Sequence, residues 1–261
     1  MPFVRTGLLL TAAAFFVSAA HAGKPVGQDK DWSVTIGAGG LYSPDYEGSD
    51  DYEFRALPYL AVTYQGWLSL SVPEGLKIAL LNDDGFKAGF LAGYRFDRDA
   101  GDNIALAGWG DVDGAIELGA FAEYRQGPFQ IALDVRQDVS GAHEGAIAKL
   151  SARYSTRVGG ALVSVGPQAT WASDNYTQTY FGITPAQAAS AALWYVPYQA
   201  DGGIKDYGLS ATVVVPLDDQ WSVTGLVSVS QLTGDAADSP IVAMLGSETQ
   251  FSAGVFVGYR F

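Results

Sequence analysis

The stretch that decides the fold is Phe251–Phe261, FSAGVFVGYRF, in which an apolar residue recurs at every second position. One face of an extended chain carries only apolar residues, namely Phe251, Ala253, Val255, Val257, Tyr259 and Phe261. The other face carries small or polar residues and one aromatic: Ser252, Gly254, Phe256, Gly258 and Arg260. A period of two predicts a β-strand with one apolar face.

The same alternation runs through most of the chain from residue 31 onward and predicts about twelve antiparallel strands. These strands are expected near residues 32–42, 52–64, 67–72, 75–81, 86–97, 114–126, 129–139, 145–158, 161–172, 203–217, 220–233 and 249–261.

Alternation alone fits a one-sided soluble sheet as well as a barrel wall, and the lengths of the connections decide between them. Tight turns are predicted at residues 65–66, 82–85, 127–128, 159–160 and 218–219. Long loops are predicted at residues 43–51, 98–113, 173–202 and 234–248. Short turns at one end and long loops at the other are the layout of an outer-membrane barrel, whose short turns face the periplasm. The sequence therefore predicts an all-β, transmembrane, up-and-down antiparallel barrel.

Composition and the C-terminal residues agree with this prediction. The longest apolar run, residues 8–20, is too short for a membrane helix, and a net charge of −13 argues against a nucleic-acid partner. Val257, Tyr259 and Phe261 resemble the C-terminal signal that the barrel assembly machinery recognises. That machinery is therefore an expected partner, as are outer-membrane lipid and lipopolysaccharide.

The N-terminus has the pattern of a secretory signal peptide. Arg5 precedes the apolar residues 8–20, and Ala20-His21-Ala22 is a small-x-small cleavage site. We expect residues 1–22 to be removed and residues 23–261 to form a single barrel domain located in the outer membrane of a Gram-negative cell. The chain has no Cys and therefore uses no disulfide.

If the apolar faces contact lipid, a group of charged residues on three neighbouring strands points into the lumen. They are Glu117, Glu123, Arg125, Asp134, Arg136, Asp138, Lys149, Arg153 and Arg157. One interpretation is a charged constriction that selects small solutes. The other is an interior filled by salt bridges, which we favour because both signs interleave and a barrel of about twelve strands is narrow.

Acidic residues gather in the predicted outer loops, for example at Asp50, Asp51, Asp111 and Asp113. Such carboxylates can bind divalent cations that bridge lipopolysaccharide phosphates. No segment has the ligand spacing of a calcium loop, so solvated loops are the simpler interpretation. We expect no metal site and no cofactor.

Catalysis is not expected either, because no nucleophile motif is present. His143 and Glu144 lie at the predicted outer rim, where Ser140 or Ser151 is a conceivable nucleophile for acyl transfer. A lone loop histidine is more often simply solvated.

The longest loop contains a helix start. Thr184 is a candidate N-cap, Pro185 occupies the first helical position, and Gln187 completes a capping box. We expect a short helix here that folds over the barrel mouth or presents a contact surface.

Four stretches resemble the MltA-interacting protein (MipA/OmpV) family of outer-membrane proteins. They are residues 44–52 (PDYEGSDDY) with Leu57-Pro58-Tyr59, residues 110–114 (GDVDG), residues 178–184 (QTYFGIT) with Gln187-Ala188-Ala189, and residues 234–242 (GDAADSPIV). The third of these stretches, together with Gln187, supplies the loop motif Tyr180, Phe181, Gly182, Thr184 and Gln187.

This resemblance implies a barrel without enzymatic activity that brings a murein-degrading lytic transglycosylase together with a penicillin-binding murein synthase. It supplies no catalytic residue. Our leading hypothesis is therefore a scaffold or binding protein, the second is a narrow channel for small solutes, and the third is a lipid-modifying enzyme at the rim. The short turns offer little periplasmic surface, so residues 23–30 are the best remaining contact for a partner.

Overall fold

The computed structural model describes residues 31–72, 74–191 and 195–261. The predicted signal peptide and the predicted contact segment 23–30 lie outside the described residues and stay predictions.

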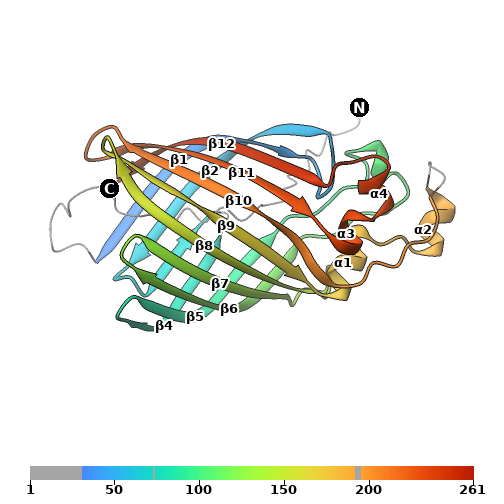
Figure 1. The fold of residues 1–261 in the computed structure, drawn as a ribbon, viewed down its shortest axis with the longest axis horizontal. Helices are drawn as coiled ribbons and strands as arrows, with labels where there is room; N and C mark the ends of the chain where they lie inside the picture. The colour runs from blue at the N-terminus through green and yellow to red at the C-terminus, as the bar shows by residue number, and fades with distance from the viewer. Residues whose placement is uncertain (1–30, 73, 192–194) are drawn as a thin grey trace, which may run out of the picture.

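Twelve antiparallel strands form a closed barrel in which β1 pairs with β12 (Figure 1). The strands are β1 (Trp32–Pro44), β2 (Tyr52–Tyr64), β3 (Leu68–Ser71), β4 (Gly75–Asp83), β5 (Phe86–Arg95), β6 (Ala115–Gln126), β7 (Phe129–Asp138), β8 (Ala146–Val158), β9 (Ala161–Ala172), β10 (Gly203–Pro216), β11 (Trp221–Leu232) and β12 (Thr249–Arg260). The predicted fold class and number of strands are confirmed.

One end of the barrel, which we call the turn end, carries the tight turns and the C-terminus (Figure 1). The turns at Gln65-Gly66 and Gly159-Gly160 have positive φ angles at both central residues. Such turns match the twist of the two strands that they join, and glycine adopts positive φ without strain. The residues of each tight turn therefore determine how its two strands are joined at this end.

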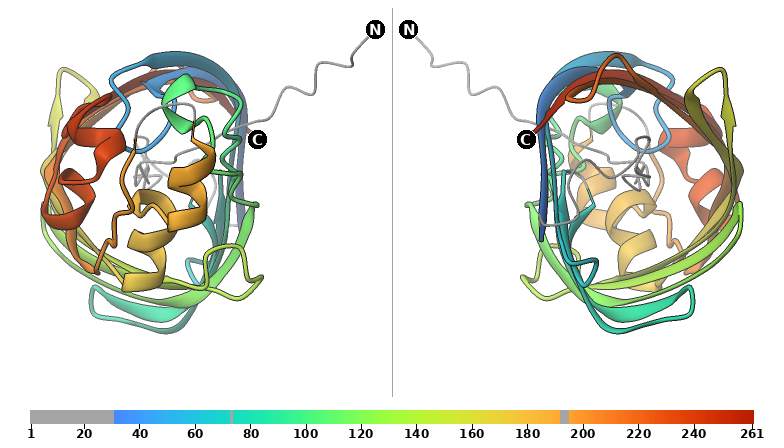
Figure 2. Two further views of the ribbon diagram at one scale, coloured as in Figure 1. Left: turned by 90° about the vertical axis from the view of Figure 1, so that its right-hand side faces the viewer. Right: turned by 90° about the vertical axis from the view of Figure 1, so that its left-hand side faces the viewer.

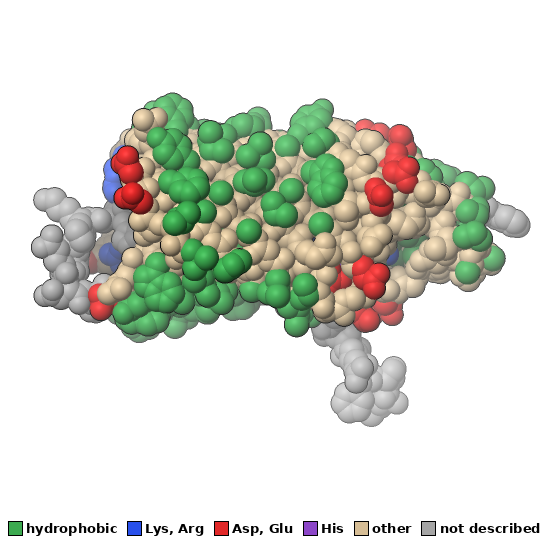
Figure 3. All heavy atoms as spheres, turned by 90° about the horizontal axis from the view of Figure 1, so that it is seen from below, with side chains coloured by type: hydrophobic (Ala, Val, Ile, Leu, Met, Phe, Trp, Pro, Cys, Tyr) green, Lys and Arg blue, Asp and Glu red, His purple; other side chains and the backbone are tan. Residues whose placement is uncertain are grey.

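The outer face of the wall is apolar along most of its height. Hydrophobic side chains are spread over the wall, and Asp and Glu gather toward its two ends (Figure 3). Aromatic pairs lie near the turn end: the rings of Trp32 and Tyr64 are 4.3 Å apart, and those of Trp221 and Tyr259 are 5.0 Å apart. These pairs fit the interfacial aromatic girdle of a membrane barrel. Among the described residues, no helix has the length and apolar character needed to cross a bilayer.

The wall is uneven at β3 and β4. β3 has only four residues and pairs with β2 through Ala61–Tyr64. The β3–β4 hairpin therefore covers the turn-end part of the wall and stops short of the opposite end. The sequence predicted both strands but not that their turn lies part-way up the wall.

The opposite end, which we call the loop end, carries the long loops and, within the described residues, all the helices. These are the 3-10 helix η1 (Ile104–Leu106) and the α-helices α1 (Asp174–Phe181), α2 (Pro185–Ser190), α3 (Gly234–Ala237) and α4 (Pro240–Ala243). Figure 2 shows α1 and α2 lying across the barrel mouth. The predicted helix in the longest loop is confirmed as α2, with Thr184 and Gln187 forming a capping box and Pro185 in the first turn.

A charge placed on the apolar face tests the assignment of faces. Leu209 is 55% exposed on the outer face of β10. Leu209→Arg is expected to lower the free energy of unfolding in lipid vesicles by about 2–4 kcal/mol, because a cation is costly near the bilayer midplane. Urea titration, followed by heat-modifiable gel migration, measures this loss.

The matched control for that variant is Thr212→Arg on the same strand, since Thr212 lines a cavity at the turn end of the lumen. Thr212→Arg is expected to lower the free energy of unfolding much less than Leu209→Arg does. Equal losses in the two variants would contradict the assignment.

Candidate functional site

The loop end is closed by a packed hydrophobic cap. Its core consists of residues from every long loop, and the largest fully buried ones are Trp109, Tyr46, Tyr176, Phe181, Leu106, Ile183, Ile241 and Val242. Apolar residues brought together from loops bury their surface as a domain core does. The cap is therefore a folded unit inside the mouth.

Hydrogen bonds between different loops fix the cap. The Tyr195 hydroxyl donates to the Ala105 carbonyl at 3.0 Å, and the Ser239 hydroxyl donates to the Phe181 carbonyl at 2.6 Å. The Gln187 amide also donates to the Trp109 carbonyl, so α2 is held to the β5–β6 loop.

Buried charges join the cap to the wall. The Lys205 ammonium lies 3.1 Å from a carboxylate oxygen of Glu47 and 2.8 Å from one of Asp206. The Tyr176 hydroxyl, on α1, donates to the other Glu47 oxygen at 2.9 Å. Lys205 and Asp206 are adjacent in sequence yet both buried, because a bulge in β10 shifts the register between Ile204 and Asp206.

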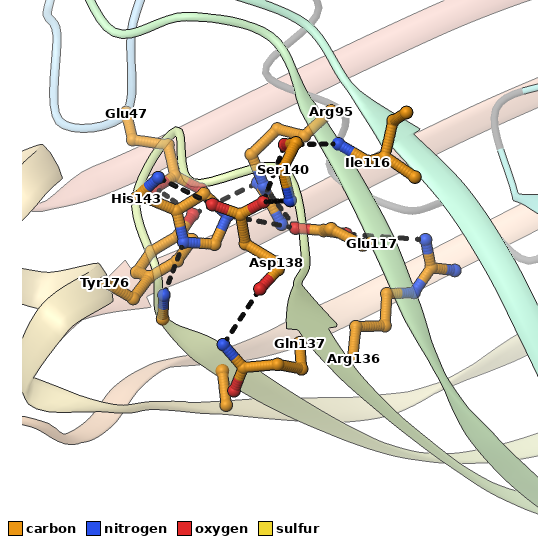
Figure 4. A network of polar contacts seen from close by, with 12 residues as sticks. Glu47, Arg95, Ile116, Glu117, Arg136, Gln137, Asp138, Ser140, His143 and Tyr176 are labelled. Atoms are coloured by element: carbon orange, nitrogen blue, oxygen red, sulfur yellow. Dashed lines mark hydrogen bonds and ion pairs between the residues drawn. The ribbon is translucent and has the colours of Figure 1, made fainter.

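Beneath the cap, Glu117 is almost fully buried and lies beside two arginines and a histidine (Figure 4). Its carboxylate lies 2.8 Å from Arg95 Nε, 3.5 Å from His143 Nε2 and 3.8 Å from Arg136 Nη1. Since an unpaired charge in such a place is very costly, this arrangement keeps the carboxylate compensated.

Further ion pairs continue from Glu117 toward the turn end, on the inner faces of the neighbouring strands β4–β7. Arg136 Nη2 lies 3.8 Å from Asp134, and Lys77 Nζ lies 3.0 Å from both Asp134 and Glu123. Six residues thus form an ion-pair chain, in the order Arg95, Glu117, Arg136, Asp134, Lys77 and Glu123.

Cavities lie on both sides of the ion-pair chain. A cavity of about 120 Å³ beneath the cap is lined by Glu117, Asp134 and Arg136. At the turn end, Lys77 and Glu123 line a cavity of about 430 Å³. A third cavity, of about 410 Å³, also opens at the turn end.

This third cavity is lined by Arg125, Arg153 and Arg157 together with Ser, Thr and Gln side chains. No acidic residue lines it among the described part of the chain. This third cavity is therefore basic, whereas the other turn-end cavity is lined by Asp31, Glu74 and Glu123 as well as by Lys and Arg.

The structure places eight of the nine predicted lumen charges in three regions, and Asp138 in a fourth. Glu117, Asp134 and Arg136 belong to the central ion-pair chain, which Glu123 ends on the turn side. Lys149 lines the cavity beneath the cap, and the three predicted arginines Arg125, Arg153 and Arg157 line the cavity at the turn end.

Asp138 has a different role from the other predicted lumen charges. It accepts hydrogen bonds from the backbone N–H groups of Ser140, His143 and Glu144 and from the Ser140 hydroxyl. The carboxylate therefore organises the β7–β8 loop.

The predicted rim residues do not form a nucleophile–base pair. His143 is buried against the rings of Tyr176 and Tyr180, and its Nδ1 accepts from the Gly145 N–H at 3.1 Å. The Ser140 hydroxyl bonds to Asp138 at 2.7 Å instead. In the described ranges, no cluster of three or more His, Asp and Glu side chains is placed to hold a metal ion.

Sequence reasoning missed Lys77, Arg95, Lys205 and Glu47. Lys77 stands between Leu76 and Ile78 in an alternating segment, which is a signal for an inward charge. Lys205 gave no such signal, because the bulge breaks the period. Glu47 lies in the predicted outer loop 43–51, whose carboxylates the sequence predicts to be solvated, whereas it pairs with Lys205 beneath the cap.

The cap tyrosines predict a pH dependence. Burial raises the pKa of Tyr180 to about 12. Burial, followed by the nearby carboxylates of Asp235, Asp238 and Asp201, raises the pKa of Tyr198 to about 12. A raised pKa in the folded state stabilises the cap fully below the ordinary tyrosine value of about 10, and that stability is lost as the pH rises through about 12.

The absorbance of tyrosinate is therefore expected to rise with pH in two steps. The step at higher pH should be accompanied by protease cleavage of the loop between β9 and β10. Tyr180→Phe and Tyr198→Phe should each reduce the upper step. An unchanged upper step in both variants would show that these side chains do not titrate with the cap.

Comparisons with known proteins agree with the barrel geometry. Residues 36–261 match the family described as MltA-interacting protein MipA. The chain is 25% identical to outer membrane protein OmpV of Vibrio cholerae serotype O1 over 239 residues, which cover 88% of this chain and 86% of that protein. It is 26% identical to outer membrane protein Omp26La of Vibrio anguillarum over 65% of this chain and 63% of that protein.

Solved outer-membrane barrels are more distant. An outer membrane channel from Pseudomonas putida F1 has a TM-score of 0.44 and 14% identity over 92% of this chain and 97% of that chain. An anion-selective porin from Comamonas acidovorans has a TM-score of 0.35 and 13% identity over 88% of this chain and 98% of that chain. On the match over residues 36–261, the chain belongs to the MltA-interacting protein MipA family of outer-membrane β-barrel proteins.

Proposed function

We propose that this protein is a closed outer-membrane barrel that acts as a binding protein, a scaffold that contacts murein enzymes from its periplasmic end. The observation that carries the proposal is the packed cap, whose buried core fills the outer mouth. A barrel that opens only toward the periplasm is suited to bind partners there.

Two features oppose a free path through the lumen. The cap covers the loop end, and the ion-pair chain from Arg95 to Glu123 lies beneath it on the inner faces of β4–β7. Opening a path through the ion-pair chain exposes charges that now compensate each other, and separating one partner of a buried pair costs about 3–5 kcal/mol. These barriers favour a binding role over a static pore.

The periplasmic end offers the contact surface for a partner. Its tight turns are short, but two cavities of about 430 and 410 Å³ open among them. Residues 23–30 precede β1, which begins at this end with Trp32. The family's name describes an interaction with MltA, and a lytic transglycosylase together with a penicillin-binding protein are the partners that we propose.

A second candidate function is a gated channel for small solutes. The observation that favours it is that cavities lie on both sides of the ion-pair chain, so a rearrangement of a few side chains and of the cap joins them. The rim-enzyme hypothesis has less support, because Ser140 bonds to Asp138 and His143 to Gly145. We propose no enzymatic activity.

Planar-bilayer recording separates the scaffold from the channel. The inserted native protein is expected to give no steady conductance steps, because both barriers are in place. A variant in which a short Gly-Ser linker replaces residues 174–201 loses α1 and α2 and serves as the control, with flickering current expected. Steady steps from the native protein would favour the channel.

A binding assay tests the scaffold itself. Detergent-solubilised protein immobilised through an outer loop is expected to retain a lytic transglycosylase, and removal of residues 23–30 should weaken that retention several-fold. Gln187→Ala, which alters only the cap, is the matched control and should bind as the native protein does. Retention that is absent, or that changes in the Gln187→Ala variant alone, contradicts a periplasmic contact.

A further inference from the structure

Three arginines line one cavity at the turn end of a chain that is acidic overall. This is the third cavity described above, of about 410 Å³, and we call it the arginine cavity. The chain has 28 acidic and 15 basic residues, so three guanidinium groups around one space run against its composition. Arg125, Arg153 and Arg157 are the charged residues of the lining within the part of the chain that the structure describes. The potential inside the cavity therefore favours an anion.

Two of the arginines belong to one row that crosses three strands. Arg125 on β6 pairs with Gln130 on β7, which pairs in turn with Arg153 on β8. At the usual strand spacing of about 4.8 Å, the Cα atoms of the two arginines lie about 10 Å apart, with the glutamine between them. The Gln130 amide oxygen accepts from Arg125 Nη2 at 2.8 Å. The sheet thus presents two guanidinium side chains on the same inner face.

A second row supplies hydroxyl groups to the same cavity. Ser155 on β8 pairs with Ser164 on β9, which pairs with Thr212 on β10. The two serine hydroxyls lie 2.8 Å apart and form one hydrogen bond. Because a hydroxyl has a single hydrogen, one serine uses its hydrogen in this bond and the other keeps its own for a ligand. Arg157 follows Ser155 by two positions on the same face of β8 and completes the lining.

The acidic residue beside the first row has a cation of its own. Glu123 precedes Arg125 by two positions on the inner face of β6 and lines the neighbouring cavity. Its carboxylate lies 3.0 Å from Lys77 Nζ and accepts from the Gln130 amide at 3.3 Å. Since Lys77 compensates this carboxylate, Glu123 repels an anion in the arginine cavity less than an isolated carboxylate does.

We propose that the arginine cavity binds a small periplasmic solute that carries two or more carboxylate or phosphate charges. Guanidinium groups match both kinds of anion through paired, charge-assisted N–H bonds, and the serine and threonine hydroxyls donate to further oxygens. Arginines on β6 and β8 approach the cavity from different strands, which suits a ligand with more than one charged group. The cavity also has the size of a small-molecule site. Because the turn end faces the periplasm, the solute enters from that compartment.

Isothermal titration calorimetry of the barrel refolded in detergent micelles tests the site. Pyrophosphate is the phosphate probe and citrate is the carboxylate probe. At least one of them is expected to bind with one equivalent per barrel and a Kd below about 1 mM. Binding of pyrophosphate alone identifies phosphate as the recognised group, and binding of citrate alone identifies carboxylate. Added sodium chloride should weaken the binding, because salt screens charges that lie near water.

Substitutions make the test specific to the cavity. Arg153→Gln and Arg157→Gln should each weaken binding about ten-fold, because each removes a charged donor. Arg153→Lys keeps the charge and should restore part or all of the affinity. Arg260→Gln is the matched control, since Arg260 lies at the turn end of β12, donates to the Asp219 carbonyl at 3.1 Å and does not line the arginine cavity. Heat-modifiable gel migration verifies that all the variants fold.

Two results would overturn the proposal. The first is that neither pyrophosphate nor citrate binds the native barrel at concentrations up to about 10 mM. The second is binding that Arg153→Gln and Arg157→Gln leave unchanged, or that Arg260→Gln weakens equally, which means that the anion responds only to the general charge of this end. The scaffold proposal is tested separately, by the removal of residues 23–30, and neither result affects it.

Discussion

Every part of this structure depends on the pairing of backbone amide groups in a hydrocarbon medium. An N–H or C=O group without a partner costs several kcal/mol inside a bilayer, so strands that cross it must form a closed ladder. The β1–β12 seam, which runs from Thr35 paired with Arg260 to Tyr42 paired with Ala253, completes that ladder. Beside β2, β3 pairs only with Ala61–Tyr64, and Pro58 has no N–H that would need an acceptor there.

Closure creates a second requirement, because a barrel of this size has a lumen too narrow for its charges to stay fully hydrated. Polar residues that alternate with the lipid-facing ones must then find partners on facing strands. Glu117 and Asp134 do so through Arg95, Arg136 and Lys77. At the turn end, Arg125 donates to Gln130 within the cavity that Arg153 and Arg157 also line.

The sequence predicts the wall well because each strand obeys a local rule, with an apolar residue at every second position and a tight turn at one end. It predicts the cap poorly. Residues such as Trp109 and Ile241 lie in loops without any period, and only the fold brings them together. The inward direction of Lys205 is not predicted for a different reason. A single inserted residue in β10 reverses the face of its neighbours. Proline is an ambiguous signal here, because Pro58 lies where β2 has no partner strand on one side, whereas Pro167 lies in β9 between two partner strands.

The cap joins residues that are very distant along the chain. Glu47 and Lys205 are separated by 158 positions, and the Gly48 N–H bonds to Gln250 across 202 positions. Contacts of this kind form late, because most of the chain must be ordered before their ends meet. The cap therefore cannot assemble on a barrel whose first and last strands are still apart. A closed outer mouth therefore indicates that assembly of the barrel is complete. An unfinished barrel remains open to the outside until its final strand has docked.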